Sequence, residues 1–173
     1  MRVLSIAHVR GTSIDDCAMV GHRHDDQRFH FDDVESWVLR LGPGGGTEAK
    51  PQIQAGRHAW YTRLWRSPTG RLFVSQSSGF VHISRADGEG WDSHRLPFVV
   101  DGVWGLDDDC VFAWGVTTQS KPLWQWNGQK WREVSSPGHI GAMGGVSTRL
   151  IRAVGAMGMV ARWDGNSWTQ LPT

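Results

Sequence analysis

The chain has 173 residues, and its 18 Lys and Arg nearly balance its 17 Asp and Glu. This length suits one domain whose core needs no disulfides, and the near-zero net charge argues against a protein built to neutralise nucleic-acid phosphates. Two cysteines are too few for a disulfide scaffold. No stretch approaches the roughly 20 apolar residues of a membrane helix, and MRVLSIAHVR lacks the features of a secretory signal. We therefore expect a soluble, cytoplasmic protein that binds neither nucleic acid nor membrane.

Tryptophan and glycine stand out in the composition, with 11 Trp and 22 Gly against a single Tyr. Long apolar heptads and runs rich in Ala, Leu, Glu and Lys are absent, which disfavours helix. Short apolar runs between glycines and polar residues favour strands instead. The sequence divides into four similar units of about 40 residues each, over 7–42, 59–98, 99–137 and 138–173.

The first unit opens with two short segments, HVRGTS at 8–13 and CAMVG at 17–21. A polar stretch, GHRHDDQRFHFDD, follows, and Trp37 comes four residues after Asp33. The Gly- and Pro-rich stretch after this unit predicts an exposed loop inserted over 43–58. The residues MRVLSI, ahead of the first unit, match the tail of a fourth strand, and we expect them to cover or pair with the last unit.

The three later units repeat one pattern more clearly. A Trp stands four residues after an Asp or Asn that is followed by Gly, in DGEGW, NGQKW and DGNSW. Such dipeptides between apolar runs predict hairpins, because Gly adopts positive φ cheaply and the Asp or Asn side chain bonds its own backbone. In the third unit we expect four strands, near Gly102–Leu106, Cys110–Gly115, Pro122–Trp126 and Lys130–Ser135.

Four-stranded antiparallel units of this kind, arranged radially, make a β-propeller. The stretches VDGVWGLDDDCVFAWG and LWQWNGQKWREVSS resemble the VWG…AVG…WDGxxW repeats of bacterial β-propellers. SRADGEGW is similar to the Asp-box of sialidase-type, BNR-like propellers, where this turn is structural and lies away from the chemistry. The resemblance implies an all-β propeller of four blades, each with four antiparallel strands, and it implies little about function.

Four units fit a closed four-bladed ring, the smallest common propeller, and we expect closure. In the alternative, the ring is open. Its two end sheets would then expose apolar faces, and the chain would pair with a second copy as a homodimer.

The first strand of each unit would line the central channel. Aligning the units places Arg10, Trp65 and Trp104 at one position, and Arg66 directly after it in the second unit. We predict that these four residues contact a protein partner, because Trp and Arg dominate interaction hot spots. In the alternative interpretation, the two indoles fill space between units.

The polar stretch of the first unit is the one candidate metal site. His22 and His24 share a face of a strand, and a turn after them would bring His30 across from the pair. Two or three imidazoles with a carboxylate would suit zinc, whereas the alternative is a solvated hairpin tip. We expect no bound cofactor.

Motifs of catalysis are lacking in the sequence. It has no Gly-x-Ser-x-Gly elbow, phosphate loop or His-Glu-x-x-His, and its one Tyr is Tyr61, where a sialidase-like enzyme needs a Tyr nucleophile beside an arginine cluster. We predict a non-catalytic binding module for another protein, in its most specific form a dedicated inhibitor or an immunity protein that masks a toxin. A carbohydrate-binding lectin and a metal-dependent hydrolase using the three histidines remain alternatives.

Overall fold

The computed structural model describes residues 2–25, 35–49 and 60–172. These residues form four sheets, each of four antiparallel strands in chain order. A single turn of 3-10 helix, η2 (Ala156–Gly158), interrupts this pattern in the described part of the chain. Among the described residues, no helix has the length and apolar composition required to cross a bilayer.

Each sheet is a meander in which every strand pairs with the next one along the chain. The first sheet contains β1 (Arg2–Ser13), β2 (Asp16–Asp25), β3 (Glu35–Gly42) and β4 (Gly45–Ala49). The second contains β5 (Tyr61–Arg66), β6 (Leu72–Gln76), β7 (Phe80–Ser84) and β8 (Trp91–Arg95). The third contains β9 (Val99–Asp107), β10 (Cys110–Val116), β11 (Leu123–Trp126) and β12 (Trp131–Val134). The fourth contains β13 (Ile140–Ser147), β14 (Leu150–Gly155), β15 (Val160–Trp163) and β16 (Trp168–Gln170).

The turns before the last strand of the three later sheets have the predicted chemistry. The Asp164 carboxylate accepts hydrogen bonds from the backbone N–H groups of Asn166 and Ser167, at 2.8 and 2.9 Å. These bonds lower the pKa of Asp164. The glycine in each turn has positive φ, at 79° for Gly88, 87° for Gly128 and 106° for Gly165. The Trp after each turn begins the fourth strand, as expected.

The first sheet departs from the expected register. Trp37 lies on the third strand, β3, opposite Gly21 of β2, rather than on the fourth strand. The expected loop over 43–58 was wrong at its start, because residues 45–49 form β4. Pro43 and Gly44 make the connecting turn, with Gly45 following at a φ of 100°. This unit has Val34 where the others have Gly, so its Asp33 carries no hairpin signal.

Consecutive sheets pack face to face and bury an apolar layer at each junction. Alternate residues of a strand point to opposite faces, so a central strand such as β10 buries one set against the second sheet and the other against the fourth. The clusters join Val74 to Ala18, Phe73 to Val111, and Phe112 to Ile151.

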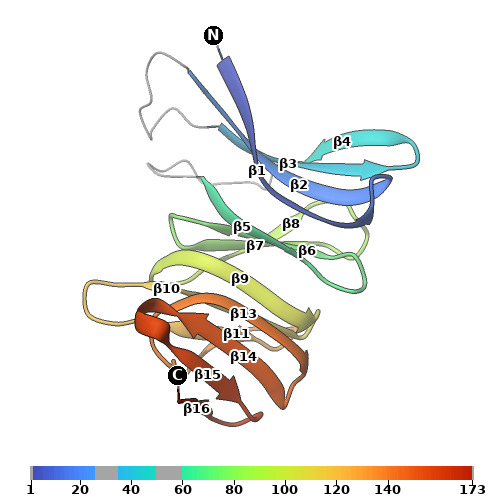
Figure 1. The fold of residues 1–173 in the computed structure, drawn as a ribbon. Coiled ribbons are helices and arrows are strands. Elements are labelled where there is room, and N and C mark those ends of the chain that lie inside the picture. Colours follow the sequence, from blue (N-terminus) through green and yellow to red (C-terminus); the bar gives the residue numbers. More distant parts are fainter. Residues whose placement is uncertain (1, 26–34, 50–59, 173) are drawn as a thin grey trace.

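The four sheets form an open row rather than a closed ring. The first and fourth sheets lie at opposite ends of the row in Figure 1, and each sheet packs on its neighbours in the chain. The expectation of closure was therefore wrong. The opening residues do not reach the last sheet either, because they belong to β1 and pair with β2, as Ile6 does with Gly21.

Candidate binding groove between the second and third sheets

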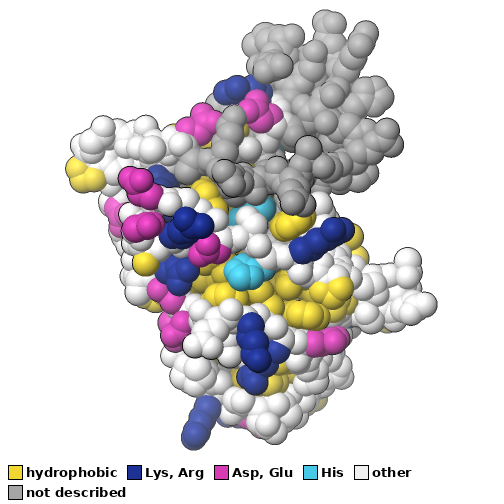
Figure 2. All heavy atoms as spheres, turned by 180° about the vertical axis from the view of Figure 1, so that it is seen from behind, with side chains coloured by type: hydrophobic (Ala, Val, Ile, Leu, Met, Phe, Trp, Pro, Cys, Tyr) yellow, Lys and Arg dark blue, Asp and Glu magenta, His cyan; other side chains and the backbone are white. Residues whose placement is uncertain are grey.

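A groove of about 990 Å³ runs between the outer strands of the second sheet and the third sheet. On this side of the molecule, Figure 2 shows histidine side chains set in apolar surface, with basic and acidic side chains around them. Eleven residues line the groove: Arg71, Phe80, Ile83, Arg85, Trp91, Asp92, Ser93, His94, Trp126, Gly128 and Gln129.

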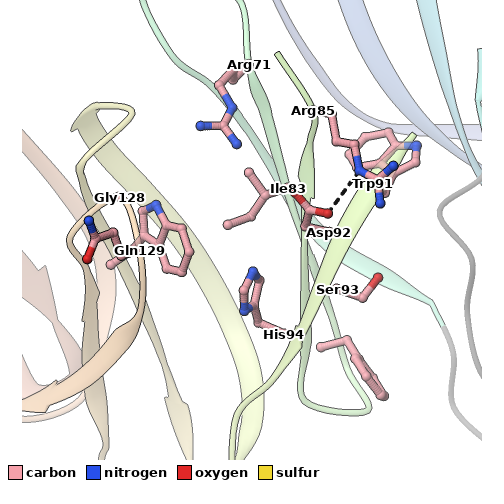
Figure 3. Close-up of a pocket in the computed structure, with 11 residues that line it drawn as sticks. Arg71, Ile83, Arg85, Trp91, Asp92, Ser93, His94, Gly128 and Gln129 are labelled. Carbon is pink, nitrogen blue, oxygen red and sulfur yellow. Dashed lines mark hydrogen bonds and ion pairs between the residues drawn. The ribbon is translucent and has the colours of Figure 1, made fainter. Parts of the chain in front are cut away.

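The strand β8 supplies one wall of the groove. Asp92 pairs with Ile83, and His94 pairs with Val81, on the side of β7 that packs against the third sheet. Paired residues share a face, so Asp92 and His94 lie on the side of the third sheet. Figure 3 shows both side chains directed into the space whose far side is formed by Gln129 in the turn before β12.

Aromatic rings form the floor of the groove. The imidazole of His94 lies 4.8 Å from the indole of Trp126, centroid to centroid, and that indole packs at 5.7 Å on Trp131. Partial burial lowers the pKa of His94, and the Asp92 carboxylate opposes the shift. The imidazole is therefore neutral at neutral pH. The buried indole N–H of Trp126 has no hydrogen-bond partner.

Two arginines flank these rings and differ in their pairing. Arg85 donates from Nε to the Asp92 carboxylate at 3.0 Å, in an exposed ion pair. Arg71 donates from Nε to the carbonyl oxygen of Ser84 at 3.1 Å, and its guanidinium lies 6.0 Å from the ring of Phe73. In the described part of the chain, no carboxylate pairs with Arg71. Its half-buried cation is held in place and directed toward the groove in Figure 3.

The four residues predicted from the sequence lie elsewhere. Trp65 is buried between the second and third sheets, 5.2 Å from the ring of Phe73, and Trp104 packs against the same cluster. Both indoles thus have the placement of the alternative interpretation, in which they fill space between units. Arg66 binds the first sheet through Asp16, with Nη2 donating to Oδ1 at 2.6 Å, and Arg10 is exposed on β1. A partner contact by the four stays a prediction.

The histidine cluster lies partly outside the described residues. His30 is among residues 26–34, which the structure does not describe, and the side chain of His24 is not described either. His22 shares a hydrogen bond of 2.9 Å between its Nδ1 and the hydroxyl of Ser36. No group of three potential metal ligands occurs within the described ranges. The zinc site stays a prediction.

Tyr61, the one tyrosine, is buried. Its hydroxyl has no hydrogen-bond partner, and burial raises its pKa above the ordinary value of a phenol. The phenol thus remains protonated.

A smaller hollow of about 450 Å³ opens beside the inner strands of the second to fourth sheets. Arg63, Asp101 and His139 line it, together with Trp114. Burial raises the pKa of Asp101, whereas the neighbouring cations oppose the shift, His139 most strongly. Asp101 thus supplies a carboxylate near the cations of this hollow, although no ion pair joins it to Arg63 among the described residues.

Sequence reasoning missed the groove because its residues come from three separate strands and three turns. One signal was present in the sequence. Trp126 directly precedes the Asn127–Gly128 turn, and Asp92 directly follows the Trp of the DGEGW motif. The sequence did not show that these turns lie against the next sheet, so the side chains that line the groove could not be placed together.

No family model matches the chain, and no curated protein matches it. Among solved structures, the chain is similar to "YCF48 bound to D1 peptide", with a TM-score of 0.62 and 15% identity over 96% of this chain and 53% of that one. The fold is that of a β-propeller. Each four-stranded sheet is accordingly a blade. A fungal six-bladed propeller, Aleuria aurantia lectin, with "novel fucose recognition mode", aligns with a TM-score of 0.45 and 14% identity, over 99% of this chain and 62% of that one. The chain thus spans between half and two thirds of the length of these structures.

Proposed function

We propose that this chain is a non-catalytic binding module, and that the groove between blades two and three holds a segment of a partner protein. The segment presents a carboxylate beside an apolar side chain. The observation that supports this proposal is Arg71, a half-buried guanidinium that is oriented by a backbone carbonyl, beside aromatic walls, and has no acidic partner among the described residues.

Charge and shape favour a peptide with an acidic residue. Arg85 is neutralised by Asp92, and His94 is neutral, so Arg71 leaves the groove with one net positive charge. A planar guanidinium binds a carboxylate through two parallel hydrogen bonds, while indole and phenyl surfaces take an apolar neighbour. YCF48, a protein of the same fold, is bound to a peptide in the structure that this chain resembles. The fold is therefore compatible with such a role.

The groove differs from blade to blade, which favours one dedicated partner over a multivalent lectin. Strand pairing makes Arg132 in blade three and Thr169 in blade four equivalent to Asp92. Cys110 and Leu150 stand where blade two has Arg71. A lectin with repeated pockets would place the same residues in each blade. In its most specific form, the proposal is an inhibitor or immunity protein bound to one toxin, acting in the cytoplasm.

The test is selection from a displayed library of random peptides against the purified chain. We expect enrichment of an acidic residue next to an aromatic or aliphatic one. The best synthetic peptide should bind roughly tenfold or more weakly to Arg71→Gln, because a hydrogen bond to a charged group contributes about 1.5–3 kcal/mol. The same peptide with Gln in place of its acidic residue should lose a similar factor.

Two variants serve as controls. Arg71→Lys keeps the charge but loses the forked geometry and should bind at an intermediate level. Arg132→Gln removes an exposed cation that does not line the groove, and it should bind like the unaltered chain. Equal binding to Arg71→Gln and the unaltered chain would contradict the proposal. Binding of neutral sugars on a glycan array, with no peptide selected, would support the lectin instead.

A further inference from the structure

The two ends of the row expose faces that the inner blades bury. We call the face of a blade that is directed toward the next blade in the chain its forward face, and the opposite face its rear face. Every residue of β6 in blade two is buried, on both faces. In β14 of blade four, buried residues alternate with exposed ones, since Ile151 and Ala153 pack on blade three and Arg152 and Val154 do not.

The rear face of blade one is apolar. Ala18 and Val20 face blade two, so Met19 between them points to the rear. Strand pairing places Val9, Met19 and Leu39 in one row across three strands, with Glu48 next to Leu39 on the fourth. Val9 is 48% exposed, and Ile6 on the same strand is 56% exposed.

The forward face of blade four combines an apolar row with two cations. Ala142, Val154 and Val160 are paired across three strands, and Val154 is 47% exposed. In the adjacent row, Arg152 and Arg162 lie directly opposite each other. Neither has an acidic partner among the described residues. Like charges directly opposite on paired strands are destabilising, so a carboxylate supplied from outside would relieve this repulsion.

The packing of consecutive blades within the chain shows which kind of surface fits the forward face of blade four. Strand pairing makes Arg162 equivalent to Gln125, on the forward face of blade three. It also makes Leu39 and Glu48 equivalent to Ala161 and Gln170, on the rear face of blade four.

Blades two and three show the stacking in detail: Ile83, at the position of Arg162, packs with Trp126, at the position of Leu41. Val81, at the position of Val160, packs with Ala113 and Trp124, at the positions of Met19 and Leu39. If another blade one stacks on blade four in the same way, Arg162 comes to the side of Leu41 and Val160 to the side of Leu39. The apolar row on each face then meets the other.

From this complementarity we propose that the forward face of blade four binds the rear face of blade one in a second copy of the chain. The interface is head to tail, because it joins two different surfaces. Two such interfaces between two chains close a ring of eight blades, which is at the upper end of the range of propellers. The apolar rows supply the buried surface. The proposal is independent of the groove between blades two and three.

The first experiment measures mass by sedimentation across a range of concentrations. We expect a reversible species of about twice the 19.3 kDa of the chain. Val154→Asp blocks the forward end and Val9→Asp blocks the rear end, and each alone should be monomeric. Both positions are about half exposed, so the fold should survive, which circular dichroism verifies. A mixture of the two variants should form a one-to-one complex through the single intact interface.

The mixture separates the proposed geometry from its competitors. If blade four instead paired with blade four, Val9→Asp would dimerise without a partner. A chain that stays monomeric at every concentration would overturn the proposal, and so would a mixture that forms no complex.

Discussion

At the scale of single residues, His82 shows how burial controls a titratable group. Its ring is fully buried, stacked 5.8 Å from Phe80 and edge-on to Tyr61 at 5.9 Å, and its Nδ1 shares a hydrogen bond of 2.8 Å with the hydroxyl of Ser93. Burial, with a smaller contribution from the neighbouring His94, lowers the pKa of His82 to about 4. The imidazole is therefore neutral throughout the physiological range.

This group makes stability depend on pH in a defined window. The folded pKa lies below the unfolded value of 6.5, so the unfolded chain takes up the proton first as the pH falls. Above pH 6.5 His82 has no effect on stability, and between pH 6.5 and 4 the free energy of unfolding decreases. We expect a loss of about 2 kcal/mol between pH 7 and pH 5 from this group.

Urea unfolding at pH 7 and pH 5 measures the effect. His82→Phe keeps an aromatic ring but cannot be protonated, so its stability should fall less over the same interval. Other titratable groups contribute equally to both proteins. An identical pH dependence in the variant and the unaltered chain would show that His82 does not carry the linkage.

The environments of His82 and Arg71 could not be predicted from the sequence. His82 stands in FVHIS, where its neighbours Val81 and Ile83 mark a strand, but nothing in that pattern says that both faces of the strand are covered. Arg71 stands directly before the apolar run LFVS, yet whether a carboxylate pairs with it depends on packing against the neighbouring blade. Such properties arise from packing between blades rather than from local pattern.

At the scale of the strand, close contact between a glycine and an indole fixes the pairing of β9 with β10. Gly102 lies opposite Trp114, and a Cβ at Gly102 would overlap the six-membered ring of that indole. The same arrangement recurs in the first blade, where Gly21 lies under Trp37. These glycines make room for a large buried side chain on the adjacent strand.

Gly102→Ala should therefore destabilise the chain. Forcing extra volume into a packed core costs about 1–3 kcal/mol, because neighbouring side chains must leave their preferred rotamers. Gly141→Ala is the matched control, since an added Cβ at that strand position meets only ordinary contacts, the nearest at 3.7 Å. Thermal unfolding of both variants measures the difference. Equal midpoints would mean that Trp114 moves aside without cost.

Strand order and hairpin turns were predictable from the sequence, because their signals are local. Asp164 with Gly165 and Asn127 with Gly128 identify turns by chemistry that acts within four residues. The strand assignment of the first blade was wrong because Trp37, four residues after Asp33, was assigned to the fourth strand, although Val34 rather than Gly follows Asp33. The Pro43–Gly44 dipeptide was the better signal, but it was assigned to a loop.

At the scale of the molecule, the open row makes protection from solvent uneven. The central strands β6 and β10 are buried on both faces, whereas β14 is covered on one face. Local opening costs less free energy where fewer apolar contacts must break.

We therefore expect amide hydrogens of β6 and β10 to exchange more slowly than those of β14. The measurement is hydrogen–deuterium exchange with mass spectrometry, carried out at dilution and repeated at high concentration. Protection of β14 should rise at high concentration if a second copy covers it. Uniform protection of all three strands at dilution would contradict the uneven stability inferred here.

The described residues of the first blade do not pack on the fourth blade, as Figure 1 shows, and this separation has a kinetic consequence. A closed ring must bring the two ends of its chain together before its last interface forms, and that loop closure slows folding. In this chain each blade needs only its own strands and the blade made before it. Folding can therefore keep pace with synthesis on the ribosome, one blade at a time, from the N-terminus onward.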